Sequence, residues 1–262
     1  MTITLNGTTG ITTPDVTSDS GASLTSRVAK TGDTMTGNLE IQSSGGSQLK
    51  VHKTGVTTLG VHPAIDFQLT QTNTQSALLG QISGEFISGW GGDLILSTKP
   101  ANSTPDNNVI SRMRIDSAGR VTMPYQPAFR ATSDNNSQSL TNNVTAVAVF
   151  DVAETNIGGH YNTANGKFTA PVSGFYSFAS SLLITQGGAV RIDLMFYKNG
   201  SPWVSHEFKD YGAVSSNSSV TAAMHGYLSA NDFVEIVVMI GGANGGIYQE
   251  PKFWNFSGFL VG

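Results

Sequence analysis

Five polar residues in the second half of the chain could contact a ligand. Each is a tyrosine or a side-chain amide within a stretch rich in Gly, Ser and Asn: Gln186, Tyr211, Asn217, Asn244 and Tyr248. Flat aromatic rings beside amide donors and acceptors suit sugars and other polar surface groups. We therefore expect a receptor-binding surface there, and the alternative for any single residue is a plain solvent-exposed turn.

Metal and phosphate chemistry find little support in the sequence. The five histidines are scattered, without a His-x-His or an i, i+4 pair that would let one chain chelate a metal: His52, His62, His160, His206 and His225. The glycines of residues 241–246 miss the dinucleotide-binding spacing, and neither Lys-Ser nor Lys-Thr follows them, so a hairpin loop is expected. We predict no metal and no cofactor, with calcium left open for lack of a clear site.

Catalytic motifs are likewise missing from the sequence. It has no Gly-x-Ser-x-Gly elbow, no cysteine, and no carboxylate pair that can be assigned to a shared cleft. We therefore predict a protein that is not an enzyme. A depolymerase acting on surface glycans is the enzymatic alternative.

Composition points to strands and turns. Only 12% of the 262 residues are charged, about half the usual share, while Thr, Ser, Asn and Gly are abundant. β-branched Thr fits a pleated strand, and Gly and Asn supply turns with positive φ, so an all-β fold is expected. The net charge of -4 has no block of either sign and no long apolar run exists, which predicts neither nucleic-acid binding nor membrane insertion.

The last 138 residues have the pattern of a sandwich domain. Apolar runs lengthen there, and Tyr176, Phe178 and Leu182 alternate so that they share one face of a strand. Pro124 and Pro127 hold the chain extended before it. We predict a domain over residues 125–262, with strands near 175–184, 190–198, 203–208, 220–228, 233–240 and 253–261.

Seven residues at fixed spacing carry a family resemblance: Phe150, Asn156, Tyr161, Phe168, Gly174, Tyr176 and Phe178. This spacing resembles the signature of the globular head of the complement first-component q protein, a trimeric jelly roll shared in outline with tumour necrosis factor. The resemblance implies a ten-strand jelly-roll sandwich in which these residues pack the core or the trimer. It also implies that loops 185–189, 211–219 and 241–250, with the five candidate contact residues, form the apex.

The first 124 residues cannot build a compact core from their short apolar runs. Residues 1–30 suggest an attachment segment with a short helix near 22–30, and residues 31–124 alternate in brief stretches such as 64–69, 92–96 and 113–116. Such strands become stable when three chains bury a common seam. The run 30–41, with its Gly-Asp-Thr-Met-Thr-Gly turn, resembles the short repeat of phage tail fibres, which implies an elongated trimeric β-rich shaft over 31–124.

These features together predict a homotrimeric phage tail fibre, made in the host cytoplasm and located in the virion tail. Its amino terminus would dock on phage tail or baseplate proteins, and its head would bind host surface polysaccharide or protein. The alternative function is a purely structural spacer, collar or capsid decoration without receptor contact.

Overall fold

The computed structural model describes residues 64–70, 76–87, 91–101, 108–134, 137–186, 191–209, 217–248 and 250–262. Strands dominate these residues, and the one helical element among them is the single 3-10 turn η2 (Pro251–Phe253). The expected all-β class is therefore confirmed. The attachment segment, its expected helix and the fibre-like repeat at 30–41 lie outside the described residues. Within the described part, no helix has the length and apolarity to span a membrane.

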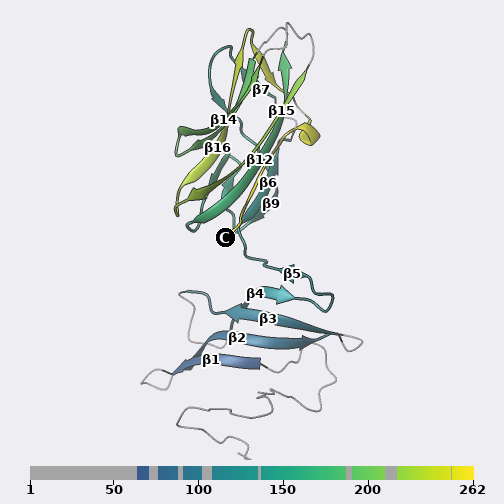
Figure 1. Ribbon diagram of the computed structural model, residues 1–262, viewed down its shortest axis with the longest axis vertical. Helices are drawn as coiled ribbons and strands as arrows, with labels where there is room; N and C mark the ends of the chain where they lie inside the picture. The colour runs from purple at the N-terminus through teal and green to yellow at the C-terminus, as the bar shows by residue number, and fades with distance from the viewer. Residues whose placement is uncertain are drawn as a thin grey trace, which may run out of the picture. The chain divides into compact units, whose positions relative to one another are not determined.

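A five-stranded sheet occupies the first part of the described chain. Its strands follow one another as an antiparallel meander (Figure 1). They are β1 (Ala64–Thr70), β2 (Ser76–Phe86), β3 (Gly92–Thr98), β4 (Ile110–Ile115) and β5 (Val121–Thr122). The turn before β5 is closed by the Asp116 carboxylate, which accepts the backbone N–H groups of Ala118 and Arg120 at 2.9 Å, while Gly119 takes φ 80°. This sheet forms within one chain.

The head folds into two packed sheets. One has the order β10-β11-β16-β13-β14 with β8 on β16, and the other β7-β17-β12-β18-β6-β9 with β15 on β12 (Figure 1). The strands are β6 (Ala128–Thr132), β7 (Gln138–Leu140), β8 (Ala146–Val147), β9 (Val152–Ile157), β10 (Tyr161–Asn162), β11 (Lys167–Thr169), β12 (Gly174–Gln186), β13 (Arg191–Lys198), β14 (Ser201–Lys209), β15 (Ser218–Leu228), β16 (Phe233–Gly241), β17 (Gly245–Ile247) and β18 (Asn255–Leu260). The expected jelly-roll sandwich is confirmed.

Aromatic rings fill the space between the two sheets. The Phe129 ring stacks on Tyr161 and on Phe168, with ring centroids 4.9 and 4.8 Å apart. Tyr176 and Phe178 alternate inward along β12 and are almost completely buried, as period 2 requires. Contacts between so many aromatic rings bury large apolar areas, so the head has a self-sufficient core.

Two of the seven signature residues have clear local reasons for their identity. The amide of Asn156 brackets the backbone of Tyr161, donating to its carbonyl at 2.8 Å and accepting from its N–H at 3.1 Å. A Cβ on Gly174 would lie 2.7 Å from Leu260 Cδ1 and 3.0 Å from the Gly262 carbonyl oxygen, so any other residue would displace the Leu260 side chain and crowd the chain end. The other five side chains are buried in the core.

The chain enters and leaves the head at the same end. Strand β6 pairs with the closing strand β18, and the Leu260 N–H donates to the Pro127 carbonyl at 3.0 Å. Gly174 starts β12 at this end, and ten residues at about 3.3 Å each place Ile184 about 33 Å away. The far end of β12 is therefore remote from the connection to the rest of the chain.

The head departs from the sequence-based prediction in its smaller strands. Segments β6 to β18 exceed the expected ten strands, because short strands β7, β8 and β17 join the sheet edges. Strand β17 lies within the glycine-rich stretch expected to be only a loop. The division of the chain at residue 125 and the trimeric state of residues 31–124 remain predictions.

Candidate functional site

The far end of β12 brings together segments that are distant in sequence. Ile184 pairs with Ile247 of β17 on one side and with Ser218 of β15 on the other. Strand β17 pairs in turn with β7, where Ile247 lies opposite Gln138. Strands β7, β12, β15 and β17 therefore meet at this end of the sheet, which brings residues distant in sequence side by side.

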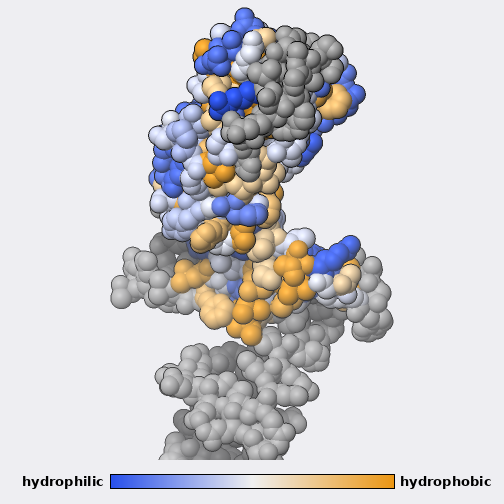
Figure 2. Space-filling model, turned by 45° about the horizontal axis from the view of Figure 1, so that its top comes forward, coloured by the Kyte–Doolittle hydropathy of each residue, from blue (hydrophilic) through white to orange (hydrophobic). Residues whose placement is uncertain are grey.

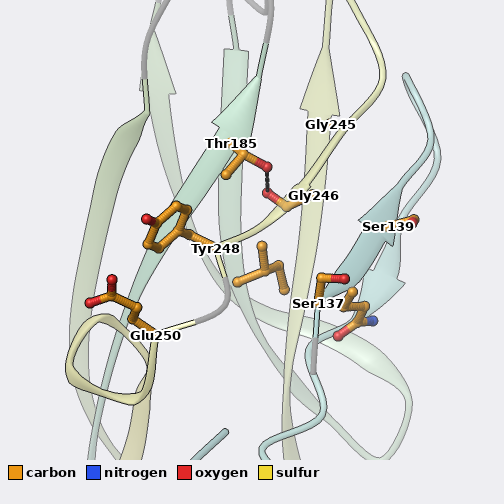
Figure 3. A pocket seen from close by; sticks show the side chains of 9 residues that line it. Ser137, Ser139, Thr185, Gly245, Gly246, Tyr248 and Glu250 are labelled. Carbon is orange, nitrogen blue, oxygen red and sulfur yellow. Dashed lines mark hydrogen bonds between the residues drawn. The ribbon is translucent and has the colours of Figure 1, made fainter. Parts of the chain in front are cut away.

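A pocket of about 520 Å³ opens at this end of the sheet (Figure 3). It is lined by Ser137, Gln138, Ser139, Thr185, Gly245, Gly246, Ile247, Tyr248 and Glu250. Tyr248 and Glu250 lie on the left of the view in Figure 3, and Ser137 and Ser139 lie on the right. Its volume falls within the range usual for small-ligand sites.

Two of the lining side chains form hydrogen bonds to backbone groups of the head. The Gln138 amide donates to the Val147 carbonyl and accepts the Val149 N–H at 3.2 Å. The Thr185 hydroxyl donates to the Gly246 carbonyl at 3.0 Å, a bond drawn in Figure 3. The Gln138 bonds tie β7 to residues 147–149, and the Thr185 bond ties β17 to β12, so the pocket is preformed.

Gly246 contributes no side chain to the base of the pocket. A Cβ on Gly246 would lie 3.1 Å from the Gln138 carbonyl oxygen and 3.4 Å from the Thr185 hydroxyl oxygen. Such contacts are tighter than side chains usually adopt, so a larger residue would push β7 and β12 apart. The exposed backbone of β17 thus forms part of the binding surface.

Tyr248 is the aromatic wall of the pocket. Its N–H donates to the Leu183 carbonyl at 2.7 Å, and its own carbonyl accepts the indole N–H of the buried Trp254. Its half-buried ring packs edge-on against Phe253, with centroids 5.9 Å apart. The backbone and one ring edge are therefore fixed, which orients the remaining ring surface and the hydroxyl.

The pocket presents polar groups with little net charge. Glu250 forms an ion pair with Lys252, and this hydrogen bond raises the pKa of the Lys252 ammonium above its ordinary value. No histidine lies among the nine lining residues, and the described part of the chain contains no cluster of three potential metal ligands among His, Cys, Asp and Glu. Hydroxyls, one phenol ring and a neutralised carboxylate suit a neutral polyhydroxylated ligand.

The structure describes four of the five predicted contact residues, and all four lie near this end of β12. Tyr248 lines the pocket, and Gln186 ends β12 opposite Gly245. Asn217 is exposed directly before β15, whereas the Asn244 carbonyl oxygen accepts the Asn142 N–H at 2.9 Å and so ties two loops together. Tyr211 lies outside the described residues.

Sequence reasoning missed the other polar residues that line the pocket. Ser137 and Ser139 come from β7 and its approach, more than 100 residues before Gly245 and Tyr248. Thr185 and Glu250 lie within the predicted apical loops 185–189 and 241–250 but were not among the five selected residues. Only the pairing of β17 with both β7 and β12 brings these residues together.

A second surface lies at the opposite end of the same sheet. Phe175 pairs with Tyr227 across β12 and β15, their ring centroids are 5.6 Å apart, and both rings are exposed. Val261 donates its N–H to the Phe175 carbonyl at 2.7 Å, and Phe259 lies opposite Ser177 on the same face. We call Phe175, Tyr227, Phe259 and Val261 the aromatic stripe. Each is about half exposed or more, which is unusual for a clustered apolar set.

Comparisons with known proteins agree on the head. The family described as "C1q domain" matches residues 128–261. Complement C1q tumor necrosis factor-related protein 3 of Mus musculus is 30% identical over 114 residues, covering 43% of this chain and 44% of the relative. A complement C1q subcomponent of Mus musculus is 30% identical over 146 residues, covering 55% and 53%. The chain spans about half the length of the curated relatives that it matches.

Solved structures include a similar domain. The globular domain of zebrafish complement 1qA protein is 24% identical and covers 52% of this chain and 98% of its own, with a TM-score of 0.39.

These findings correct the functional prediction. The expected phage tail fibre, located in the virion and attaching to a host, is wrong, because the relatives are complement C1q and C1q tumor necrosis factor-related proteins of mouse and human. The alternative of a spacer, collar or capsid decoration falls with it. The fibre interpretation depended on the run 30–41, a turn followed by alternating apolar residues, and that pattern fits many β proteins.

Proposed function

Because the chain belongs to the C1q domain family, we propose that it is a recognition protein whose head assembles as a trimer and binds a neutral, polyhydroxylated ligand such as a glycan. The single observation that carries the proposal is the preformed polar pocket beside Tyr248. Its hydroxyls can exchange hydrogen bonds with sugar hydroxyls, and its aromatic ring can pack on the apolar face of a sugar ring.

The aromatic stripe supports the trimer. Exposed aromatic side chains clustered on a rigid sheet are typical of protein interfaces, because they bury a large area with few lost rotamers. The stripe is about 33 Å along β12 from the pocket, since Phe175 and Thr185 lie ten residues apart on one strand. A trimer formed through the stripe would leave three pockets open, and three weak sites on one support bind a multivalent surface far more tightly than one.

Location and catalysis follow the family. C1q-domain proteins are generally non-enzymatic, and we propose binding rather than turnover for this pocket. We also propose an extracellular location, by likeness to the complement relatives. Glycans of cell surfaces and secreted proteins are then the ligands within reach.

The test is binding of the full chain to an array of defined saccharides, followed by titration calorimetry with the strongest one. Substitution Tyr248→Ala should weaken binding by about 1–2 kcal/mol, roughly tenfold, through loss of aromatic packing area. Tyr248→Phe should retain the packing and lose only the hydroxyl contact.

The matched control is Tyr125→Ala, which removes another exposed tyrosine outside the pocket. Circular dichroism and thermal melts must show that all three variants fold. Equal affinity of the Tyr248→Ala variant and the unmodified chain would reject the pocket, and no saccharide bound at millimolar concentration would reject the ligand class.

A further inference from the structure

The five-stranded sheet has one face that is almost entirely apolar. Cross-strand partners lie on the same face of a sheet, so the strand registers define two rows of side chains. The first row is Ile65, Ile82, Leu96 and Met113, and the second is Leu94, Ile115 and Val121. Phe67 joins them, since its ring lies 3.9 Å from the Cβ position above Gly80. We call these eight residues the apolar face.

On this sheet, apolar side chains are more exposed than the polar side chains of the opposite face, which is the reverse of the usual distribution. Leu94 is 43% exposed, whereas its neighbour Asp93 on the opposite face is 5% exposed. Phe67 and Val121 are each more than half exposed, while Ser83 and Ser97 on the polar face are buried. Figure 2 shows hydrophobic residues gathered over this sheet.

The charged side chains of the sheet are satisfied on its polar face. Arg114 pairs with Glu85 at 2.9 Å and with the buried carboxylate of Asp93, and the hydrogen bond to Asp93 raises the pKa of the Arg114 guanidinium. Asp66 accepts the Gln81 amide at 2.7 Å. None of these groups points toward the apolar face. At the edge of that face, beside Phe67 and Gly80, the Arg112 guanidinium donates to the Thr98 hydroxyl at 2.9 Å, so the eight apolar residues meet a charge only there among the described residues.

We propose that the apolar face is covered by the same face of further copies of this chain, three sheets closing around one axis. The connection to the head favours this occupant over any other protein. Only residues 123–127 separate β5 from β6, a reach of at most about 18 Å. Assembly of three heads would therefore hold three sheets at high effective concentration.

The identity of the surfaces also favours further copies. A threefold ring joins one part of a surface to a different part of the same surface on the next copy, and a face made throughout of Phe, Ile, Leu, Met and Val lets any two of its parts pack together. The aromatic stripe lies at the end of the head where the connection begins, since Leu260 is hydrogen-bonded to Pro127. The rival occupant is the chain's own segment 1–63.

The absence of cysteine from the sequence makes a clean test available. The test uses four variants with one cysteine each. Ile65→Cys and Val121→Cys place the thiol on the apolar face. The controls Asp66→Cys and Thr122→Cys place it at the adjacent exposed residue on the polar face. Each full-length variant is oxidised so that thiols of adjacent copies can form a disulfide and, separately, is treated with a fluorescent maleimide. Thermal melts confirm that each variant folds.

The proposal expects covalent dimers from the two apolar-face variants only. Their reaction with the fluorescent maleimide should be at least about tenfold slower than that of the polar-face controls, because the thiol is covered in the assembly. Protection without cross-linking would overturn the proposal in favour of segment 1–63, since one chain holds a single thiol. Equal labelling of both faces would overturn it in favour of an uncovered sheet.

Discussion

The head and the five-stranded sheet are built from similar strands, yet the head buries its apolar side chains and the sheet leaves many of its own exposed. In the head, two sheets face each other and enclose Phe129, Phe168 and Phe256 almost completely. In the five-stranded sheet, no second layer is present among the described residues, and Leu94 and Phe67 are exposed. A sheet cannot cover its own apolar face, so a single layer needs a partner that a sandwich already contains.

This difference separates what one chain can stabilise from what an assembly must stabilise. The head has its own core, so it should fold whether or not copies meet. The sheet depends on burial that its own described residues do not supply. Folding and assembly are therefore expected to be distinct steps, and substitutions in the two regions should separate them.

The largest effect is expected in the core of the head. Phe256→Ala should lower the free energy of unfolding by about 3–5 kcal/mol, because the ring is fully buried against five other aromatic rings and its loss leaves a cavity. Chemical denaturation followed by tryptophan fluorescence measures this loss.

The matched control is Phe259→Ala, three residues along the same strand. Its ring is 51% exposed, so the unfolding free energy of the isolated chain should change by less than about 1 kcal/mol. If both substitutions lowered the free energy of unfolding equally, the proposed difference between the enclosed core and the exposed stripe would be wrong.

The next effect concerns assembly through the head. Phe175→Ser should weaken self-association by about 2 kcal/mol, the cost typical of truncating an aromatic interface anchor, and leave the fold intact. Sedimentation of a dilution series measures the association constant. Ala223→Ser changes an exposed residue on the neighbouring strand β15 and should have no effect; an unchanged association constant for Phe175→Ser would remove the stripe from the interface.

The smallest effect concerns pH and the turn beside the stripe. The hydrogen bond from Lys198, at 2.8 Å, and those from Asn199 and the Ser229 N–H lower the pKa of Asp232 to about 2. A carboxyl whose pKa is lowered on folding stabilises the fold above its ordinary pKa near 4, and this contribution disappears as the pH falls to about 2.

Asp232→Asn should therefore flatten the dependence of the melting temperature on pH between about 4 and 2, with a small loss at neutral pH. Thermal melts at several pH values measure the slope. An identical slope in both proteins would show that the acid sensitivity of the head has another origin.

Strand positions in the head were predictable wherever apolar residues alternate. Tyr176, Phe178 and Leu182 alternate over a long run, and β12 includes them all. Strand β17 was missed because two of its three residues are glycine and carry no alternation. The sequence also does not indicate that β17 would pair with β7, since that contact joins residues more than 100 positions apart.

The candidate site was predictable only in part for the same reason. Tyr248 was selected for its ring and its position in a loop, and it lines the pocket. Ser137 and Ser139 are ordinary serines in a polar stretch, and only strand pairing gives them a role. Asn244 looked like a ligand contact, but its side chain accepts a backbone N–H from Asn142.

The most direct test is the molar mass of the intact chain in solution, measured by light scattering during size-exclusion chromatography at several concentrations. An apolar face covered by two further copies predicts a species of three times the 27.5 kDa chain mass that persists on dilution. A stable, fully folded species of one chain mass would contradict it.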